Sequence, residues 1–73
     1  PALLEALKAW RRDRARVDQV PAYVVAPDNT LVAVATALPR TDAELLRIPG
    51  IGPAKLERYG ADLLAVVEAA APG

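Results

Sequence analysis

The chain has 73 residues, no cysteine, no histidine and a formal net charge of zero, with nine basic and nine acidic side chains. This length predicts a single small domain with one core, and the missing cysteines and histidines exclude both disulfides and the usual zinc site as supports for the fold. Packed helices must therefore supply the stability, and a hydrophobic fraction of 53% is compatible with a folded unit rather than a disordered tail.

The sequence has no membrane signal. No apolar run reaches the roughly 18 residues that a membrane span needs, and no charged and then apolar leader precedes the first helical pattern. The absence of cysteine is compatible with a reducing, intracellular setting. The start at Pro1 and the ending at residues 71–73 resemble cuts at domain edges, so we expect one domain over residues 1–73 that is a fragment of a longer chain.

The first predicted helix spans residues 2–18, where apolar side chains recur at steps of three and four residues. On its polar side Lys8, Arg12 and Arg16 are four residues apart, which stacks three cations along one stripe of the helix. Residues 1–19 hold five basic side chains against three acidic ones. This helix is therefore expected to be locally positive although the chain as a whole is neutral.

The segment that follows, residues 20–25, is rich in β-branched residues and predicts an extended crossing. It is not expected to form a sheet, because no partner strand exists elsewhere in the sequence. Pro21 moves Val20 out of the helical region, so the first helix must end before it. Asp28 is suited to cap a second helix that runs to Leu38 and is ended by Pro39.

A third, short helix is predicted from the capping box of Thr41 and Glu44, and it carries Leu45 and Leu46 before ending near Pro49.

Two further helices complete the prediction. Pro53 suits the first position of a fourth helix, and Gly60 is placed to cap its end. A fifth helix follows over residues 63–70. The sequence thus predicts an all-α fold, a compact bundle of five short helices with an extended segment between the first two. Its core is expected to contain Leu7, Trp10, Ala15, Leu31, Leu46, Leu56 and Leu64.

Several short motifs occur in one order over residues 3–70. They are Leu7-x-x-Trp10-Arg11, Val20-Pro21-x-Tyr23-Val24-Val25, Asp28-x-x-Leu31, Pro39-x-Thr41, Glu44-Leu45-Leu46, Gly50-Ile51-Gly52 and Lys55-Leu56-Glu57-Arg58-Tyr59-Gly60. In this order and spacing they resemble the HRDC domain, the helicase and RNase D C-terminal domain, and most of all that of RecQ-type DNA helicases. The same module occurs in UvrD-like helicases and in RNase D.

The resemblance implies an accessory domain that helps an ATP-dependent DNA helicase to engage single-stranded or branched DNA in repair or recombination. It also implies a bacterial cytoplasmic protein that is associated with the nucleoid when it acts on DNA. We expect the isolated domain to be a monomer and to need no cofactor. Its partners would be DNA and other domains of the parent helicase.

Three features are candidates for DNA contact, and each has a simpler alternative. The cations of the first helix, flanked by Arg11, would meet phosphates, or they form an ordinary solvated surface. Tyr23 would stack on an unpaired base, or its ring packs on the first helix. The glycines before the helix at Pro53 resemble the turn of helix-hairpin-helix proteins, whose backbone amides hold a phosphate, or they form a plain tight turn. The candidate residues are Lys8, Arg11, Arg12, Arg16, Tyr23, Gly50, Gly52 and Lys55.

The sequence gives no support for catalysis. The glycine-rich segment lacks the spacing of a phosphate-binding loop, and the carboxylates fall on predicted caps or solvated surfaces rather than in a converging pair. Trp10 lies on the apolar side of the first helix and is interpreted as a structural residue. The alternative to a DNA-binding module is a docking module that contacts another domain of the same helicase or a partner protein, which the zero net charge favours.

Overall fold

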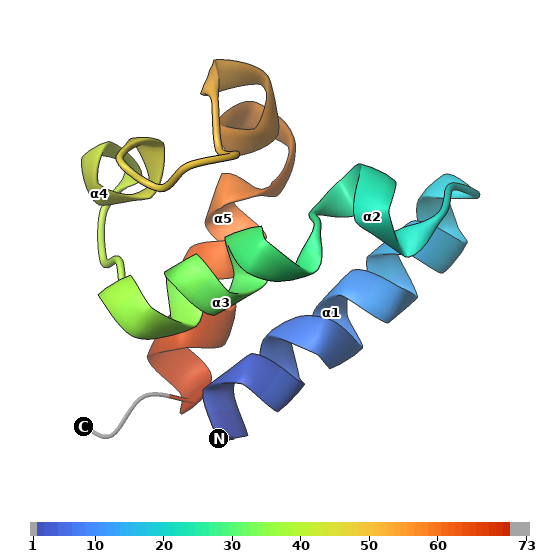
Figure 1. Ribbon diagram of the computed structural model, residues 1–73, viewed down its shortest axis with the longest axis horizontal. Helices are drawn as coiled ribbons and strands as arrows, with labels where there is room; N and C mark the ends of the chain where they lie inside the picture. Colours follow the sequence, from blue (N-terminus) through green and yellow to red (C-terminus); the bar gives the residue numbers. More distant parts are fainter. Residues whose placement is uncertain (1, 71–73) are drawn as a thin grey trace.

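The computed structural model describes residues 2–70, and over this range it contains five α-helices and no strand (Figure 1). The predicted all-α fold with five helices is confirmed. The predicted domain edges at Pro1 and at residues 71–73 lie outside the described residues. No described helix meets the length and hydropathy that a membrane crossing requires.

Helix α1 covers Ala2–Asp18, as predicted. It ends in a Schellman motif, in which the amide of Val20 donates to the carbonyl of Ala15 at 3.0 Å and the amide of Gln19 donates to that of Arg16 at 3.3 Å. Gln19 adopts the left-handed conformation that this motif requires, with φ of 57°. The motif reverses the direction of the chain, so the next segment runs back alongside α1.

Helix α2, Ala22–Val25, lies where the sequence predicted an extended crossing, so that prediction was wrong. The amide of Val24 donates to the carbonyl of Pro21 and that of Ala26 to the carbonyl of Ala22. Pro21 is the N-cap of this turn and is itself extended, with φ of −61° and ψ of 152°. Since an isolated extended segment has no strand to pair with, a single helical turn satisfies its backbone groups better.

Helix α3 covers Asp28–Ala37, and its N-cap is Pro27. The predicted capping role of Asp28 was therefore wrong by one position, and the Asp28 carboxylate pairs with Arg11 instead. The helix ends at Leu38, one residue before Pro39, with Leu38 in the left-handed region at φ of 52°. The predicted end before Pro39 is confirmed.

Helix α4 covers Asp42–Leu46 and begins with the predicted capping box. The Thr41 hydroxyl accepts from the amide of Glu44 at 3.1 Å, and the Glu44 carboxylate accepts from the amide of Arg40 at 2.9 Å. Leu45 is fully buried, whereas Leu46 is 45% exposed. The prediction of Leu46 as a core residue was wrong because consecutive residues of a helix point in different directions and only Leu45 points inwards.

The two last predicted helices are one continuous helix, α5, which covers Pro53–Ala70. Gly60 does not cap a helix end. It is buried in the middle of α5, where an added Cβ would lie 2.8 Å from Leu56 Cδ1 and 3.8 Å from Leu45 Cδ1. The glycine therefore makes room for leucine side chains at the contact of α4 with α5.

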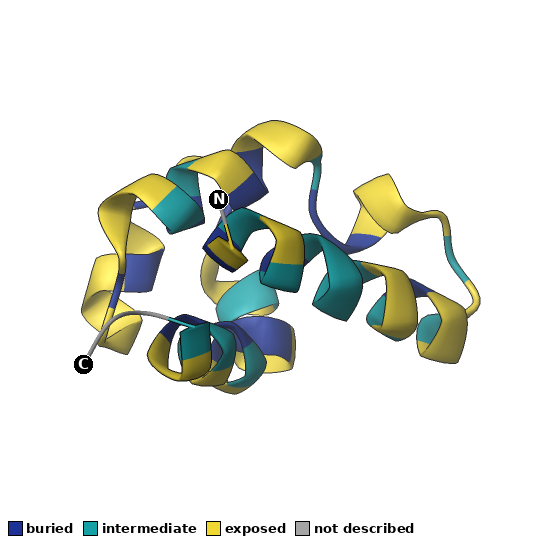
Figure 2. Ribbon diagram, turned by 90° about the horizontal axis from the view of Figure 1, so that it is seen from below, coloured by how far each residue is buried: buried dark blue, intermediate teal, exposed yellow. Residues whose placement is uncertain are grey.

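The core lies where α1 packs against α3 and α5, with α4 on α5 (Figures 1 and 2). Three of the predicted core residues, Leu7, Ala15 and Leu31, are buried, and Trp10, Leu56 and Leu64 are partly buried against the core. Helix α2 packs on the C-terminal half of α1 and is largely exposed. This outer position of α2 shapes the candidate site.

Candidate nucleic-acid interface

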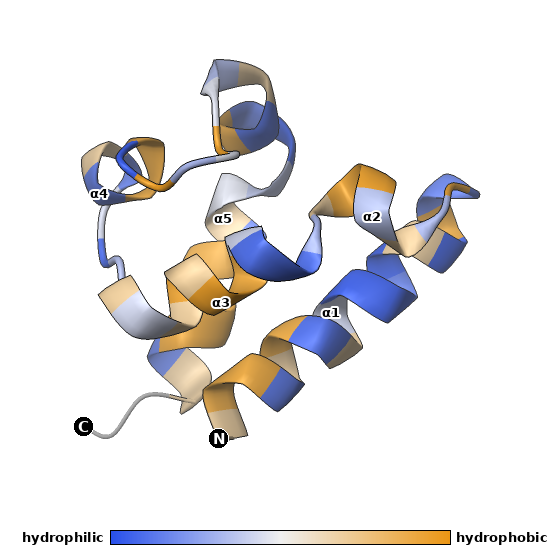
Figure 3. Cartoon of the chain, in the orientation of Figure 1, coloured by the Kyte–Doolittle hydropathy of each residue, from blue (hydrophilic) through white to orange (hydrophobic). Residues whose placement is uncertain are grey.

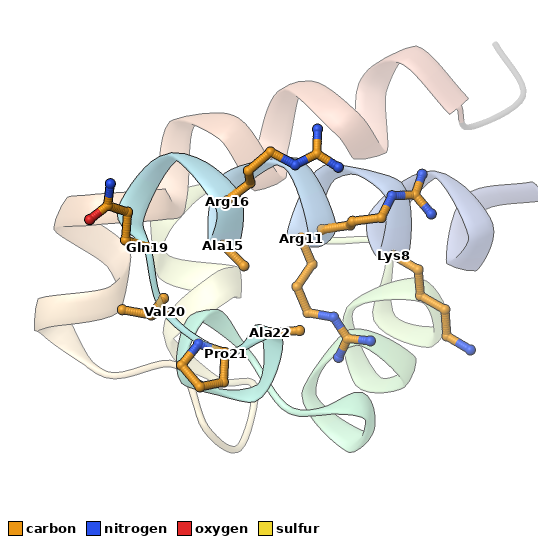
Figure 4. Close-up of a pocket in the computed structure, with 9 residues that line it drawn as sticks. Lys8, Arg11, Ala15, Arg16, Gln19, Val20, Pro21 and Ala22 are labelled. Carbon is orange, nitrogen blue, oxygen red and sulfur yellow. The ribbon is translucent and has the colours of Figure 1, made fainter.

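Four cationic side chains of α1 line one hollow on the surface beside α2 (Figure 4). We call it the α1 hollow. The Schellman motif at the end of α1 forms it, because the reversal places residues 20–22 alongside the last turns of the helix. Its lining consists of Lys8, Arg11, Arg12, Ala15, Arg16, Gln19, Val20, Pro21 and Ala22.

Lys8, Arg12 and Arg16, here called the α1 cationic stripe, line this hollow without carboxylate partners. Among residues 2–70 the ion pairs involve Arg11 and Arg14 instead. Arg12 and Arg16 are exposed, and the polar side of α1 is visible as the most hydrophilic stretch of that helix in Figure 3. The stripe thus presents charge to solvent, where an anionic partner can reach it.

Arg11 lies on the same hollow but has a different environment. Its side chain is only 13% exposed, and Nη1 donates to the carbonyl of Ala26 at 2.9 Å and pairs with Asp28 Oδ1 at 2.6 Å. The hydrogen bond and the charge of Arg11 hold the pKa of the Asp28 carboxyl below its ordinary value, and the charge of Lys8 adds to this effect. Arg11 therefore fastens the connection between α2 and α3 to α1.

Tyr23 projects from α2 into solvent, with 70% of its surface exposed. The neighbouring Ala22 lines the α1 hollow, and Val25 points into the core. A ring packed on the first helix, the simpler alternative from the sequence, does not fit this exposure. The ring is therefore accessible for stacking, next in the chain to a residue that lines the α1 hollow.

The two candidate glycines occupy the connection between α4 and α5. Gly50 has φ of +96°, and a Cβ there would overlap the Thr30 hydroxyl, so the turn itself accounts for this glycine. Gly52 has no heavy atom near the position of a Cβ, and its carbonyl accepts from the amide of Leu56 at 2.9 Å in the first turn of α5. Neither glycine is among the residues that line the α1 hollow.

Lys55 lies on the opposite side of α2 from the cationic stripe. It lines a second hollow, here called the α5 hollow, with residues of α1, α2 and α5. The other lining residues are Asp18, Val20, Val24, Ala54, Arg58 and Tyr59. Val20 borders both hollows, so α2 and the residues before it form a ridge between them.

A polar network that sequence reasoning missed joins the C-terminal end of α1 to α5. Tyr59 donates its hydroxyl proton to Asp18 Oδ2 at 2.9 Å, and Arg14 pairs with the same carboxylate at 3.2 Å. These partners lower the pKa of Asp18, the hydrogen bond from Tyr59 most of all. The spacing of Arg14 and Asp18 by four residues was the signal available in the sequence. The network therefore ties the C-terminal end of α1, which carries Asp18, to α5.

Trp10 has the structural role predicted for it. Its ring meets that of Tyr59 edge to face, with centroids 5.6 Å apart and an angle of 79°, and its Nε1 donates to Asp62 Oδ2 at 3.4 Å. The indole is partly buried against the core.

This arrangement defines a small helical module with a cationic surface and one exposed aromatic, and comparison with known proteins identifies its family. The profile of the HRDC domain matches residues 1–67. The chain belongs to the HRDC domain family. A solved structure, the D. radiodurans RecQ HRDC domain 3, superposes with a TM-score of 0.94 at 38% identity and covers 99% of this chain and 95% of its own.

Curated relatives are much longer than this chain. The ATP-dependent DNA helicase UvrD2 of Mycobacterium tuberculosis (strain H37Rv) is 57% identical over 65 residues, which are 89% of this chain and 9% of the relative. The ATP-dependent DNA helicase RecQ of Haemophilus influenzae is 35% identical over 66 residues, which are 90% of this chain and 11% of the relative. The chain thus spans about a tenth of the length of these relatives.

Proposed function

We propose that this chain is an accessory domain of an ATP-dependent DNA helicase and binds single-stranded or branched DNA weakly, without catalysis of its own. The observation that carries the proposal is the α1 cationic stripe, which has no carboxylate partner among the described residues and lines a hollow bordered by α2, the helix that carries the exposed Tyr23. The relatives support a helicase as the parent. The identity of 57% to UvrD2, against 35% to a RecQ protein, favours a UvrD-like parent over the RecQ-type parent that the sequence motifs first suggested.

The chemistry of the surface sets the kind of binding. Lys8, Arg12 and Arg16 lie along one stripe of α1, an arrangement suited to the charged backbone of a strand, so they would contact phosphates, which carry no sequence information. Tyr23 would stack on an unpaired base, which any base satisfies. Three phosphate contacts give a slope of about −2 for the logarithm of the binding constant against that of salt concentration, since each contributes about 0.7 on a single strand. The affinity is then of the non-specific kind, roughly micromolar or weaker.

Fluorescence anisotropy with a labelled oligothymidine, measured over a range of salt concentrations, tests the proposal. The wild-type domain is expected to bind at about 50 mM salt with a slope of about −2 or steeper. Arg12→Glu with Arg16→Glu removes two contacts, which lowers the affinity about 60-fold or more and flattens the slope by about 1.4.

A matched control changes the charge equally on another surface. Arg40 and Arg47 are exposed near α4, away from the α1 hollow. Arg40→Glu with Arg47→Glu should therefore change the affinity by no more than about a factor of two relative to the wild-type domain, because salt screens the long-range effect of these charges. Equal losses in both double variants would show that only net charge matters and would contradict a defined interface.

The second candidate function is docking to another domain of the parent helicase or to a partner protein. The exposed side chains of Leu38 and Leu46 and the zero net charge favour it. No DNA binding by the wild-type domain at low salt would leave this candidate standing and would overturn the first.

A further inference from the structure

The α5 hollow carries positive charge that the proposed interface does not use. Lys55 and Arg58 both line it, and neither is in an ion pair among residues 2–70. The charge of the acid in this hollow, Asp18, is already paired with Arg14 at 3.2 Å, and its carboxylate also accepts a hydrogen bond from the hydroxyl of Tyr59 at 2.9 Å. The hollow therefore has an excess of two cations.

Arg58 lies beside an aromatic ring at the hollow and is in no ion pair with a carboxylate of the described part of the chain. Its guanidinium carbon lies 5.8 Å from the centroid of the Tyr59 ring. A cation at this distance is attracted to the ring, and because the guanidinium of Arg58 is in no ion pair among residues 2–70, its N–H groups can meet an anion. The residue is also exposed, which makes those donors accessible.

The ridge between the two hollows suits an unpaired nucleotide. Ala22 borders the α1 hollow and Val24 borders the α5 hollow, and Tyr23 stands between them in the same helical turn. Tyr23 is 70% exposed and Val24 is 45% exposed, so the top of the ridge is apolar and aromatic. A duplex keeps its bases stacked inside and has no use for such a surface, whereas a single strand can place a base on it.

We propose that a single DNA strand crosses α2, with phosphates bound by the α1 cationic stripe on one side, a base stacked on Tyr23, and the following phosphates bound by Lys55 and Arg58 on the other. This inference rests on the proposed function and adds Arg58 to the interface. A strand that crosses the ridge contacts about five cations in place of three, which steepens the salt slope from about −2 to about −3.5.

The test uses the anisotropy titration with a series of oligothymidines from about 4 to about 16 nucleotides, the range of site sizes of small single-strand-binding folds. The slope is expected to steepen with length in the wild-type domain. Arg58→Gln should lower the affinity for long oligonucleotides about eightfold at about 50 mM salt, which is the counterion contribution of one phosphate contact. The affinity for the shortest oligonucleotide should not change.

Two companion variants separate binding from structure. Arg58→Lys keeps the charge and should retain most of the affinity, as expected for a contact with phosphate. Lys55→Gln removes the second cation of the hollow without touching that ring, and should give the same length-dependent loss. Arg47→Gln is the matched control and should bind like the wild-type domain.

The outcomes distinguish this inference from the proposed function. If Arg58→Gln and Lys55→Gln bind oligonucleotides of every length like the wild-type domain while the double variant of Arg12 and Arg16 loses binding, the crossing strand is wrong and the proposed function stands. If the wild-type domain does not bind at all, both the crossing strand and the proposed function are wrong. If Arg58→Gln unfolds, which circular dichroism would show, Lys55→Gln alone decides.

Discussion

Gly50→Ala is expected to destabilise the domain strongly, because two separate costs fall on one methyl group. Gly50 has φ of +96°, a conformation that costs an L-residue about 1–2 kcal/mol. The new methyl would also overlap the hydroxyl of Thr30, which is 2% exposed and donates to the carbonyl of Pro49. Such overpacking of a closed site costs about 1–3 kcal/mol. Alanine also restricts the unfolded chain, which offsets about 0.4–1 kcal/mol, so the net loss is about 1–5 kcal/mol, or about 3 kcal/mol at the middle of the ranges.

This loss is a large share of the total free energy of unfolding. A chain of this size has a free energy of unfolding of about 4–11 kcal/mol, and each kcal/mol shifts the melting temperature of a small domain by about 4–8 °C. With the middle value of about 3 kcal/mol, Gly50→Ala should therefore melt about 12–24 °C below the wild-type domain when followed by helical circular dichroism.

Gly52→Ala is the matched control, two residues away. No heavy atom lies within 4 Å of its added Cβ and its φ is not positive, so the expected cost is below about 1 kcal/mol. Equal melting temperatures for the two variants would refute the steric argument. A folded Gly52→Ala variant that no longer binds DNA would instead support a phosphate held at the start of α5.

Three further expectations concern the core, the interface and the charges. Leu45→Ala should lower the free energy of unfolding by about 2–5 kcal/mol in urea titrations, whereas Leu46→Ala should change it by less than about 1 kcal/mol; the reverse order would show that α4 is rotated. Tyr23→Ala should weaken oligothymidine binding at least about fivefold with an unchanged melting temperature, and Tyr23→Phe should bind normally. The pKa of Asp18 is lower in the folded state than its ordinary value of 3.8, so its stabilising contribution is present above that value and is lost as the pH falls through the folded pKa. Thermal melts from about pH 6 to about pH 2 should show this decline, and Asp18→Asn should make it shallower; an unchanged pH profile would show that the bonds of this carboxylate to Tyr59 and Arg14 do not contribute to stability.

The sequence predicted the helices wherever one local signal was sufficient. Apolar periodicity fixed α1, and the Thr41–Glu44 capping box fixed the start of α4. Prediction failed where tertiary packing decides between local alternatives. Gly60 has the chemistry of a helix cap, but it lies inside α5 because the packing of Leu56 and Leu45 needs the space of its missing side chain.

For the candidate site too, the sequence predicted what a local pattern decides and missed what the tertiary fold decides. Four-residue spacing predicted that Lys8, Arg12 and Arg16 lie on one side of α1, and the three do line one hollow. The partner of Arg11 could not be predicted, because the carbonyl of Ala26 reaches it only once α2 forms. Arg58 was missed because no repeat marks it, and only the fold brings it to the ridge with Lys55.

The most direct test of the interface is a titration of the isotope-labelled domain with oligothymidine at low salt, followed by the amide resonances in two-dimensional NMR spectra. The largest shifts are expected at residues 8–16 of α1 and at residues 22–25 of α2, with little change over α4. Shifts confined to α4 and the end of α3, or no shifts at all, would contradict the proposed binding of DNA through the α1 cationic stripe and Tyr23.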